Sequence, residues 1–233
     1  MRRTWIVGLF VGLVGLAVAG CTSGGSSSSA NLPAPATLLA SAGTSARSVT
    51  SVHFSIVVNG TLPAVPLTNA DGDLNAAGQA RGNAKIALLG QLTQVDFVLV
   101  DRIFYIKGPT GGYQKVPASL AGNLFDPSAI LDPNRGIAKV LGSVQNPKTV
   151  ARESVNGTDC YRITGKIGKA AVSALIPGIN TDVNATLWVA AASKNLPVKA
   201  EFAVPGNGGS QGASVDVVFS AINVPVTVTA PAN

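Results

Sequence analysis

Apolar and polar residues alternate along most of the chain, which is the pattern of strands that bury one face. The clearest run is Val52, Phe54, Ile56 and Val58, separated by polar residues such as His53. The same alternation predicts strands at 52–58, 67–74, 83–88, 94–99, 103–107, 113–116, 149–154, 159–164, 184–190, 198–204 and 214–222. The spacing therefore predicts a protein made mainly of short strands.

A few segments carry helical spacing instead. We expect an N-terminal helix over 33–49 and a short helix over 169–176, which Pro177-Gly178 ends. Asp126-Pro127 and Asp132-Pro133 each have the form of a capping residue followed by proline in the first helical turn, so two more short helices are predicted. The apolar residues assigned to these two helices are Ile130 and Leu131, then Ile137, Val140, Leu141 and Val144.

Tight turns join consecutive strands, which favours antiparallel neighbours. Asp101-Arg102 and Asn156-Gly157 are both turn signals, and the second is a strong hairpin signal. The fold class that follows is α+β, with one antiparallel sheet and a few helices grouped on one of its faces.

The first residues are typical of a targeting segment and not of the fold. Arg2 and Arg3 precede an uncharged run over 5–20, which is too short to span a bilayer as a helix. Val18-Ala19-Gly20-Cys21 resembles a bacterial lipobox, in which the cysteine is acylated and becomes the new N-terminus. The alternative is an ordinary secretory signal with a cysteine there by chance.

Three parts of the chain follow from this pattern. Residues 1–20 are predicted to be a lipoprotein signal peptide, 21–32 the lipidated Cys21 with a Ser/Gly-rich tether, and 33–233 one folded domain. A flexible tether of about nine residues reaches roughly 15–18 Å. We therefore expect the domain to lie close to a membrane, anchored through Cys21.

Composition removes several function classes. Without Arg2 and Arg3 the chain keeps fifteen basic and eleven acidic residues, and the basic ones are dispersed, so no nucleic-acid partner is expected. One His and two Cys are too few for a zinc site, and a single His on the polar side of a strand does not predict a serine hydrolase. Residues 69–73 resemble a calcium loop but lack its later Gly and Glu, and they are interpreted as a polar turn. No enzyme activity, metal or cofactor is predicted.

Three single residues receive a structural interpretation. If Cys21 is acylated, Cys160 has no disulfide partner, and its strand-like surroundings favour a small side chain packed on the sheet over a reactive thiol. His53 is expected to be at the surface or hydrogen-bonded. Trp188 could pack in the core or lie at a wet rim, and the sequence leaves both open.

The order of several short motifs resembles the mycobacterial LppX/LprA/LprF/LprG lipoprotein family, and the LprF branch most. The resemblance runs from about Leu38 to Thr229. It rests on Ser51-Val52-His53-Phe54, Asn59-Gly60, Leu62-Pro63, Asp126-Pro127, Ile130-Leu131-Asp132-Pro133, Arg135-Gly136, Val144-Gln145-Asn146-Pro147, Asn156-Gly157, Ile163-Thr164-Gly165 and Thr186-Leu187-Trp188-Val189. Ala221-Ile222-Asn223 departs from the Trp-Gly pair that relatives carry, which puts the packing of the last strand in question.

The resemblance implies a half-barrel, in which short helices cover the concave face of a strongly curved sheet and enclose an apolar cavity. The implied partners are an acylated lipid or glycolipid of phosphatidylinositol type, the outer leaflet of the plasma membrane and an export transporter, with the protein monomeric in the periplasm. The candidate cavity residues are Phe54, Ile56, Val58, Ala84, Ile86, Leu88, Phe97, Leu99, Leu131, Val140, Leu141, Ile176, Leu187 and Val189. The alternative function is a surface-exposed structural or immune-interacting lipoprotein with a packed core and no ligand.

Overall fold

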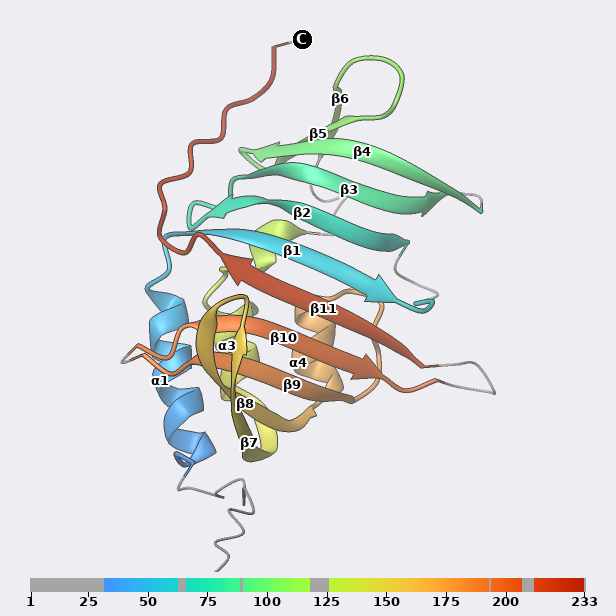
Figure 1. Cartoon of the computed structure of the whole chain (residues 1–233). Helices are drawn as coiled ribbons and strands as arrows, with labels where there is room; N and C mark the ends of the chain where they lie inside the picture. Colours follow the sequence, from blue (N-terminus) through green and yellow to red (C-terminus); the bar gives the residue numbers. More distant parts are fainter. Residues whose placement is uncertain are drawn as a thin grey trace, which may run out of the picture. The chain divides into compact units, whose positions relative to one another are not determined.

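One antiparallel sheet is the main element of the structure, a computed structural model that describes residues 32–62, 66–88, 90–117, 126–192, 194–206 and 212–232 (Figure 1). Its strands in these ranges are β1 (Ser51–Asn59), β2 (Leu67–Asn75), β3 (Ala80–Leu88), β4 (Gln91–Val100), β5 (Ile103–Lys107), β6 (Gln114–Pro117), β7 (Val144–Val155), β8 (Thr158–Ile167), β9 (Val183–Ala190), β10 (Pro197–Val204) and β11 (Ala213–Ser220). The spatial order is β6-β5-β4-β3-β2-β1-β11-β10-β9-β8-β7. Two meanders, β1 to β6 and β7 to β11, therefore join where β1 pairs with β11.

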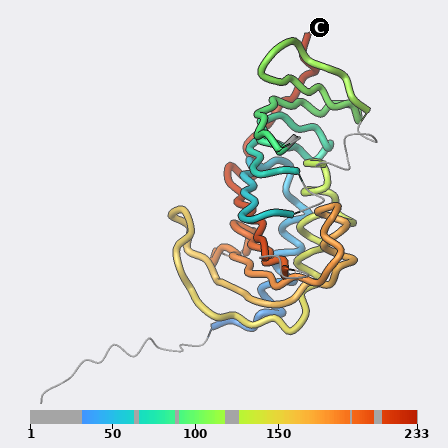
Figure 2. The backbone as a smooth tube through the Cα atoms, turned by 90° about the vertical axis from the view of Figure 1, so that its right-hand side faces the viewer, coloured from blue at the N-terminus to red at the C-terminus, as the bar shows by residue number. Residues whose placement is uncertain are grey.

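The helices lie between or before these strands. They are α1 (Pro35–Arg47), the 3₁₀ helix η1 (Pro127–Ala129), α3 (Ile137–Gly142) and α4 (Lys169–Leu175). Figure 2 shows α3 and α4 on one side of the curved sheet, and α1 packs against α3. The predicted fold, one curved antiparallel sheet with short helices over its concave face, is confirmed. Among the described residues, no helix combines the length and apolarity that crossing a membrane requires.

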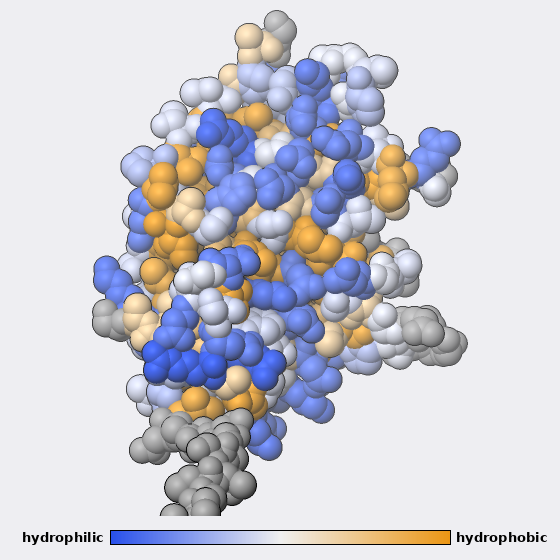
Figure 3. All heavy atoms as spheres, viewed as in Figure 1, coloured by the Kyte–Doolittle hydropathy of each residue, from blue (hydrophilic) through white to orange (hydrophobic). Residues whose placement is uncertain are grey.

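The alternating pattern explains which face of the sheet is buried. Phe54 of β1 pairs with Phe219 of β11, and Ile56 pairs with Val217, so these side chains point to the same face. They belong to one large apolar core cluster that also includes residues of α1 and α3. On the face seen in Figure 3, polar side chains are spread over the strands with smaller apolar areas between them.

Local irregularities add to the curvature. The strand register shifts in β2 between Leu67 and Asn69 and in β10 between Pro197 and Lys199. β7 carries two further shifts opposite β8. Bulges of this kind bend a strand and increase its twist, which favours a sheet that curls around its core.

The two predicted hairpin turns are confirmed by their backbone angles. Asp101 and Arg102 have φ of 52° and 62°, and Asn156 and Gly157 have φ of 49° and 81°. Positive φ at both central residues is the geometry that matches the twist of an antiparallel hairpin.

The prediction of a helix capped by Asp132 is wrong. The Asp132 side chain instead accepts a hydrogen bond from the Asn134 backbone N–H at 2.8 Å, and α3 begins only at Ile137. Between them the chain turns at Gly136, where a β-carbon would lie 2.6 Å from the Asp132 carbonyl oxygen. The first predicted helix is confined to η1, where Asp126 does cap the Ser128 N–H. Val144, assigned to a helix, starts β7, which begins five residues before the predicted strand.

Two other local predictions need correction. Residues 69–73 lie inside β2 and do not form a polar turn, because Ala70, Gly72 and Leu74 supply a buried face between the polar positions. The last strand ends at Ser220, two residues early, since Ala221 and Asn223 adopt φ of 45° and 63°. The Asn223 side chain accepts a hydrogen bond from the Thr50 N–H at 2.8 Å, which ties the C-terminal segment to the start of β1.

Candidate functional site

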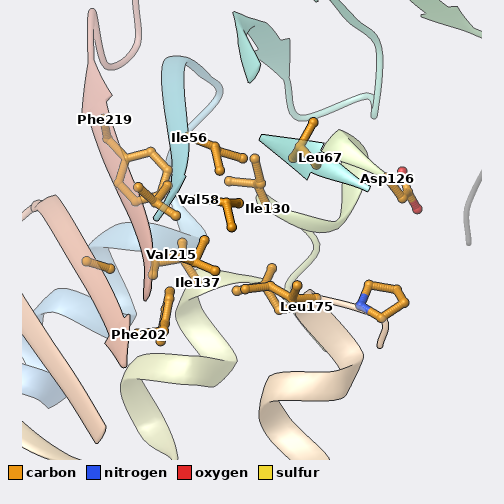
Figure 4. A pocket seen from close by; sticks show the side chains of 14 residues that line it. Ile56, Val58, Leu67, Asp126, Ile130, Ile137, Leu175, Phe202, Val215 and Phe219 are labelled. Carbon is orange, nitrogen blue, oxygen red and sulfur yellow. The ribbon is translucent and has the colours of Figure 1, made fainter. Parts of the chain in front are cut away.

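An apolar pocket lies between the middle of the sheet and the helices on its concave side (Figure 4). Its free volume is small, about 50 Å³. The fourteen residues that line it are Ile56, Val58, Leu67, Asp126, Ile130, Ile137, Leu175, Ile176, Pro177, Ala200, Phe202, Val215, Val217 and Phe219. All but Asp126 are apolar, so the pocket suits hydrocarbon.

Three neighbouring strands supply the floor of the pocket through their register. Val58 of β1 pairs with Val215 of β11, and Val215 also pairs with Phe202 of β10. Ala200 of β10 pairs with Val217 in the same way. Because paired residues point to one face, alternate positions on three strands form a continuous apolar surface.

The opposite wall comes from the connection between the two meanders and from α4. Ile130 follows η1, and Ile137 begins α3, with the close turn at Gly136 between them. Leu175 ends α4, and Ile176 leaves the helix with extended backbone before Pro177. The ends of these short helices thus place large apolar side chains over the floor of the pocket.

Asp126 is the polar point of the pocket and is held by several hydrogen bonds. Its Oδ1 accepts from the Ser128 hydroxyl at 2.6 Å, and its Oδ2 accepts from Arg135 Nη2 at 3.0 Å. Arg135 Nε also donates to Asp132 at 3.0 Å. Burial lowers the pKa of Arg135, but Asp132 and Asp126 outweigh burial and hold it above its ordinary value. The arrangement fixes a charged group at the edge of an apolar space.

Three of the candidate cavity residues line this pocket, namely Ile56, Val58 and Ile176. Leu99 lines a neighbouring polar hollow, and Leu131 lines a small groove beside α3. Seven candidates are buried in the main core outside the pocket: Phe54, Ala84, Phe97, Val140, Leu141, Leu187 and Val189. Ile86 packs half-buried against that core. The side chain of Leu88 and the whole of Cys21 lie outside the described residues.

None of the pocket-lining residues of β10 and β11 was among the candidates predicted from the sequence. Val215, Val217 and Phe219 alternate along their strand as regularly as the β1 residues do. The missing information was that β11 is the neighbour of β1, a pairing between the two ends of the domain. No comparable sequence signal marks Leu175 or Pro177, whose place depends on how α4 packs.

Cys160 and Trp188, whose surroundings the sequence did not settle, lie on the convex face of the sheet. Cys160 is fully buried in a small cluster with Trp188, Ala190 and Val198, on the face opposite Leu187. The Trp188 indole N–H donates to Glu153 at 2.6 Å. Trp188 therefore lies neither in the main core nor at the pocket rim. Burial, followed by the Asp159 and Glu153 charges, raises the pKa of the Cys160 thiol.

His53 lies between two carboxylates on the same convex face. Its Nδ1 is 2.9 Å from Asp73 Oδ1, and its Nε2 is 3.4 Å from Asp71 Oδ2. This matches the expectation of a hydrogen-bonded surface histidine. Within the described ranges, no group of three or more His, Cys, Asp or Glu side chains is arranged to hold a metal ion.

Comparison with known proteins gives matches over nearly the whole domain. A family model described as LppX_LprAFG lipoprotein matches residues 34–228. The lipoarabinomannan carrier protein LprG of Mycobacterium tuberculosis is 31% identical over 224 residues, which cover 95% of this chain and 92% of that protein.

Solved structures share the same fold. The crystal structure of LprF from Mycobacterium bovis matches with a TM-score of 0.73 at 27% identity, covering 87% of this chain and 100% of that one. The crystal structure of LppX from Mycobacterium tuberculosis matches with a TM-score of 0.63 at 23% identity, covering 84% and 100%. The second match supports the fold alone.

Proposed function

Because this chain belongs to the LppX_LprAFG lipoprotein family, we propose that its apolar pocket holds the acyl chains of a lipid or glycolipid and carries them through the cell envelope. The observation that carries this proposal is the lining of the pocket, in which thirteen of fourteen residues are apolar. A polar or charged small molecule would find a single ionisable group there. The name of the relative LprG, a lipoarabinomannan carrier, supports a glycolipid.

The physical need for such a carrier follows from the cost of moving hydrocarbon through water. Exposing one methylene group costs about 0.8 kcal/mol, so a chain of about 15 methylenes costs on the order of 12 kcal/mol. In the pocket, the chain exchanges the apolar membrane interior for side chains such as Val217 and Phe219. The carrier therefore removes most of the barrier to transfer between membranes.

The place of action is proposed from the N-terminal sequence. An acylated Cys21 would hold the protein at the outer leaflet of the plasma membrane, and the tether to residue 32 would keep the domain near that surface. A lipid exporter in the same membrane is the partner that would supply cargo. The proposal includes no catalytic step.

The test is the lipid content of a non-acylated protein. The Cys21→Ala chain would be purified from a mycobacterial host, extracted with organic solvent and analysed by mass spectrometry. About one acylated lipid per protein is the expected result. Protein free of lipid would contradict the proposal and favour a surface lipoprotein with a packed core.

Two tryptophan variants locate the bound lipid. Ala200 is a small residue on the pocket floor and is buried, so Ala200→Trp should displace the acyl chains. Ala40 is exposed on α1, so Ala40→Trp adds the same side chain away from the pocket. Loss of lipid in the first variant alone supports the pocket as the site, and equal lipid in both contradicts it.

A further inference from the structure

The hairpin that joins β3 to β4 ends in open space. Leu88 of β3 pairs with Gln91 of β4, so two residues connect the strands. A β-carbon at Gly90, the second of the two, would meet nothing within 4 Å. Figure 1 shows that β4 begins on the side of the sheet on which β1 and β3 end. The end of this hairpin is therefore free to contact another body.

Leu92 exposes a large apolar side chain beside this turn. Its exposed fraction of 68% is the highest among the large apolar side chains of the described residues. It pairs with Ala87, which is exposed as well. In Figure 3 an apolar area lies between hydrophilic ones on this side of the molecule. Single apolar residues are ordinary on a protein surface, so the neighbours of Leu92 decide what its exposure means.

The neighbours are two lysines and a tyrosine. Lys85 is exposed and points to the same face of the sheet as Leu92, because it lies two residues before the strand partner of Leu92. Lys107 ends β5, and its Nζ lies 5.9 Å from the centre of the Tyr113 ring. Asp96 pairs with Lys107 across the sheet, so these residues together carry two positive charges and one negative charge.

Such a set of side chains is typical of a membrane–water interface. A leucine can enter the boundary between headgroups and acyl chains, and tyrosine rings are enriched at the headgroups. Long lysine side chains extend their ammonium groups to the polar layer, where each one strengthens binding to an anionic bilayer. Neither Lys85 nor Lys107 forms a salt bridge with another described residue, so both ammonium groups are available.

The apolar pocket reaches the same end of the sheet. Val58, which lines it, is the last residue but one of β1, and Leu67, which also lines it, begins β2. Leu67 pairs with Ile86 of β3, which precedes the hairpin turn. Neighbouring strands lie about 4.8 Å apart, so Leu92 on β4 is roughly 10 Å across the sheet from the strand that carries Leu67. A bilayer that touches the hairpin is therefore close to the pocket.

We propose that Leu92, Lys85, Lys107 and Tyr113 form a docking surface through which the domain lies on a bilayer that contains anionic lipid. Leu92 enters the boundary between headgroups and acyl chains, and the two lysines contact the anionic headgroups. The inference assigns the orientation of the domain at the membrane. It rests on the proposed carrier function for the purpose of docking and not for its geometry.

The test is a fluorophore placed at the hairpin of the anchored protein. Leu92→Cys would be labelled with the environment-sensitive dye NBD, because an acylated Cys21 and a buried Cys160 leave the new thiol as the reactive one. Val224→Cys is the matched control: Val224 is 52% exposed, and its carbonyl accepts a hydrogen bond from Ser51 at the opposite end of β1.

Both labelled proteins would be reconstituted in vesicles of equal parts phosphatidylcholine and phosphatidylglycerol. At position 92 we expect about threefold brighter emission than in water, shifted to the blue, and quenching by lipids with a doxyl group on the acyl chain. At position 224 we expect neither change. Each distinguishes insertion of the hairpin from simple nearness to the membrane.

The lysines are tested in the Leu92→Cys protein. Lys85→Gln and Lys107→Gln should each lower the ratio of docked to undocked protein about fivefold, and vesicles of pure phosphatidylcholine should weaken docking as well. Lys194→Gln is the control, since Lys194 is exposed in the turn between β9 and β10, away from the hairpin, and should leave the ratio unchanged.

Three results would overturn the proposal. Equal signals from positions 92 and 224 would show that the anchor brings the whole domain to the bilayer without a preferred surface. A signal at position 92 that persists on pure phosphatidylcholine and without both lysines would remove the role of anionic lipid. A dye at position 92 that stays in water on every vesicle would favour a protein partner for Leu92.

Bound lipid would be extracted from the same preparations, which separates this inference from the function on which it rests. Docking through Leu92 by a protein that yields no lipid would support the surface and contradict the carrier function. Extracted lipid from a protein that does not dock would support the carrier and overturn the surface.

Discussion

Gly72 of β2 and Gly82 of β3 are paired across the sheet with no room for a side chain at either position. A β-carbon at Gly82 would lie 2.7 Å from the Gly72 α-carbon and would also collide with the Asp71 carbonyl oxygen. Phe54 pairs with Gly72, and Phe97 pairs with Gly82. In this row across β1 to β4, the rings of Phe54 and Phe97 therefore flank the two glycines.

This close approach predicts a large effect of one methyl group. Gly82→Ala should destabilise the domain by about 1–3 kcal/mol, because backbone must move to make room. Gly142→Ala is the control, since a β-carbon there meets nothing within 4 Å. Chemical unfolding would be measured for both variants. Equal stability of the two would show that β2 and β3 can separate without cost.

Sequence periodicity predicted the strands but not this contact. The strand over 67–74 is predicted correctly, yet residues 69–73 within it are also interpreted as a polar turn, because they resemble a calcium loop that lacks its later ligands; all of them lie in β2. The identity of the facing residue depends on register, which hydropathy does not contain. The prediction of a helix capped by Asp132 is wrong for a related reason. Asp132-Pro133 has the same local sequence signal as Asp126-Pro127, and the close packing at Gly136 distinguishes the two sites.

Cys160 is predicted to be unreactive in the folded protein. It is fully buried, its thiol donates to the Thr158 carbonyl at 3.3 Å, and burial raises its pKa. Since the thiolate is the reactive form, a thiol reagent should modify it far more slowly in the folded state than in guanidinium. The Cys21→Ala chain, in which Cys160 is the single thiol, is the protein to use. Similar rates in both states would contradict its burial.

The Asp132 carboxylate should make the stability of the folded protein decrease at low pH. Burial raises its pKa, but hydrogen bonds from the Asn134 backbone and from Arg135 outweigh burial, so the pKa lies below its ordinary value. The stability it contributes is therefore fully present above about pH 4 and is lost as pH falls through the lower pKa of the folded state. Asp132→Asn should lose less stability between pH 7 and pH 3 than the unchanged protein. An equal loss in urea unfolding would refute this role.

The pocket was predictable only in part. Ile56 and Val58 were found because they alternate within one strand, and alternation is visible in the sequence. Phe202 and Val215 line the same pocket only because β10 and β11 follow β1 in the sheet. Trp188 shows the converse limit: it follows Leu187 directly, yet that single step in a strand puts it on the opposite face.

The lipobox predicts that Cys21 anchors the protein. Cys21→Ala should move the protein from the membrane to the soluble fraction and remove the mass of the acyl chains, because two or more chains are needed for stable anchoring. Cys160→Ala is the control and should remain membrane-bound. Unchanged fractionation and unchanged mass of the Cys21→Ala protein would contradict the anchor.

Ala84 tests whether the lipid site extends beyond the pocket seen here. Ala84 lies on the concave face of β3, paired with Ala70, outside the pocket lining. If acyl chains reach this part of the face, Ala84→Trp should abolish lipid binding with little change in Tm, since the indole takes their place. In a closely packed core the same change should cost about 1–3 kcal/mol. Thermal unfolding and extractable lipid, measured on one preparation beside Ala40→Trp, distinguish the two: a clear fall in Tm would confine the cavity to the β1–β11–β10 floor.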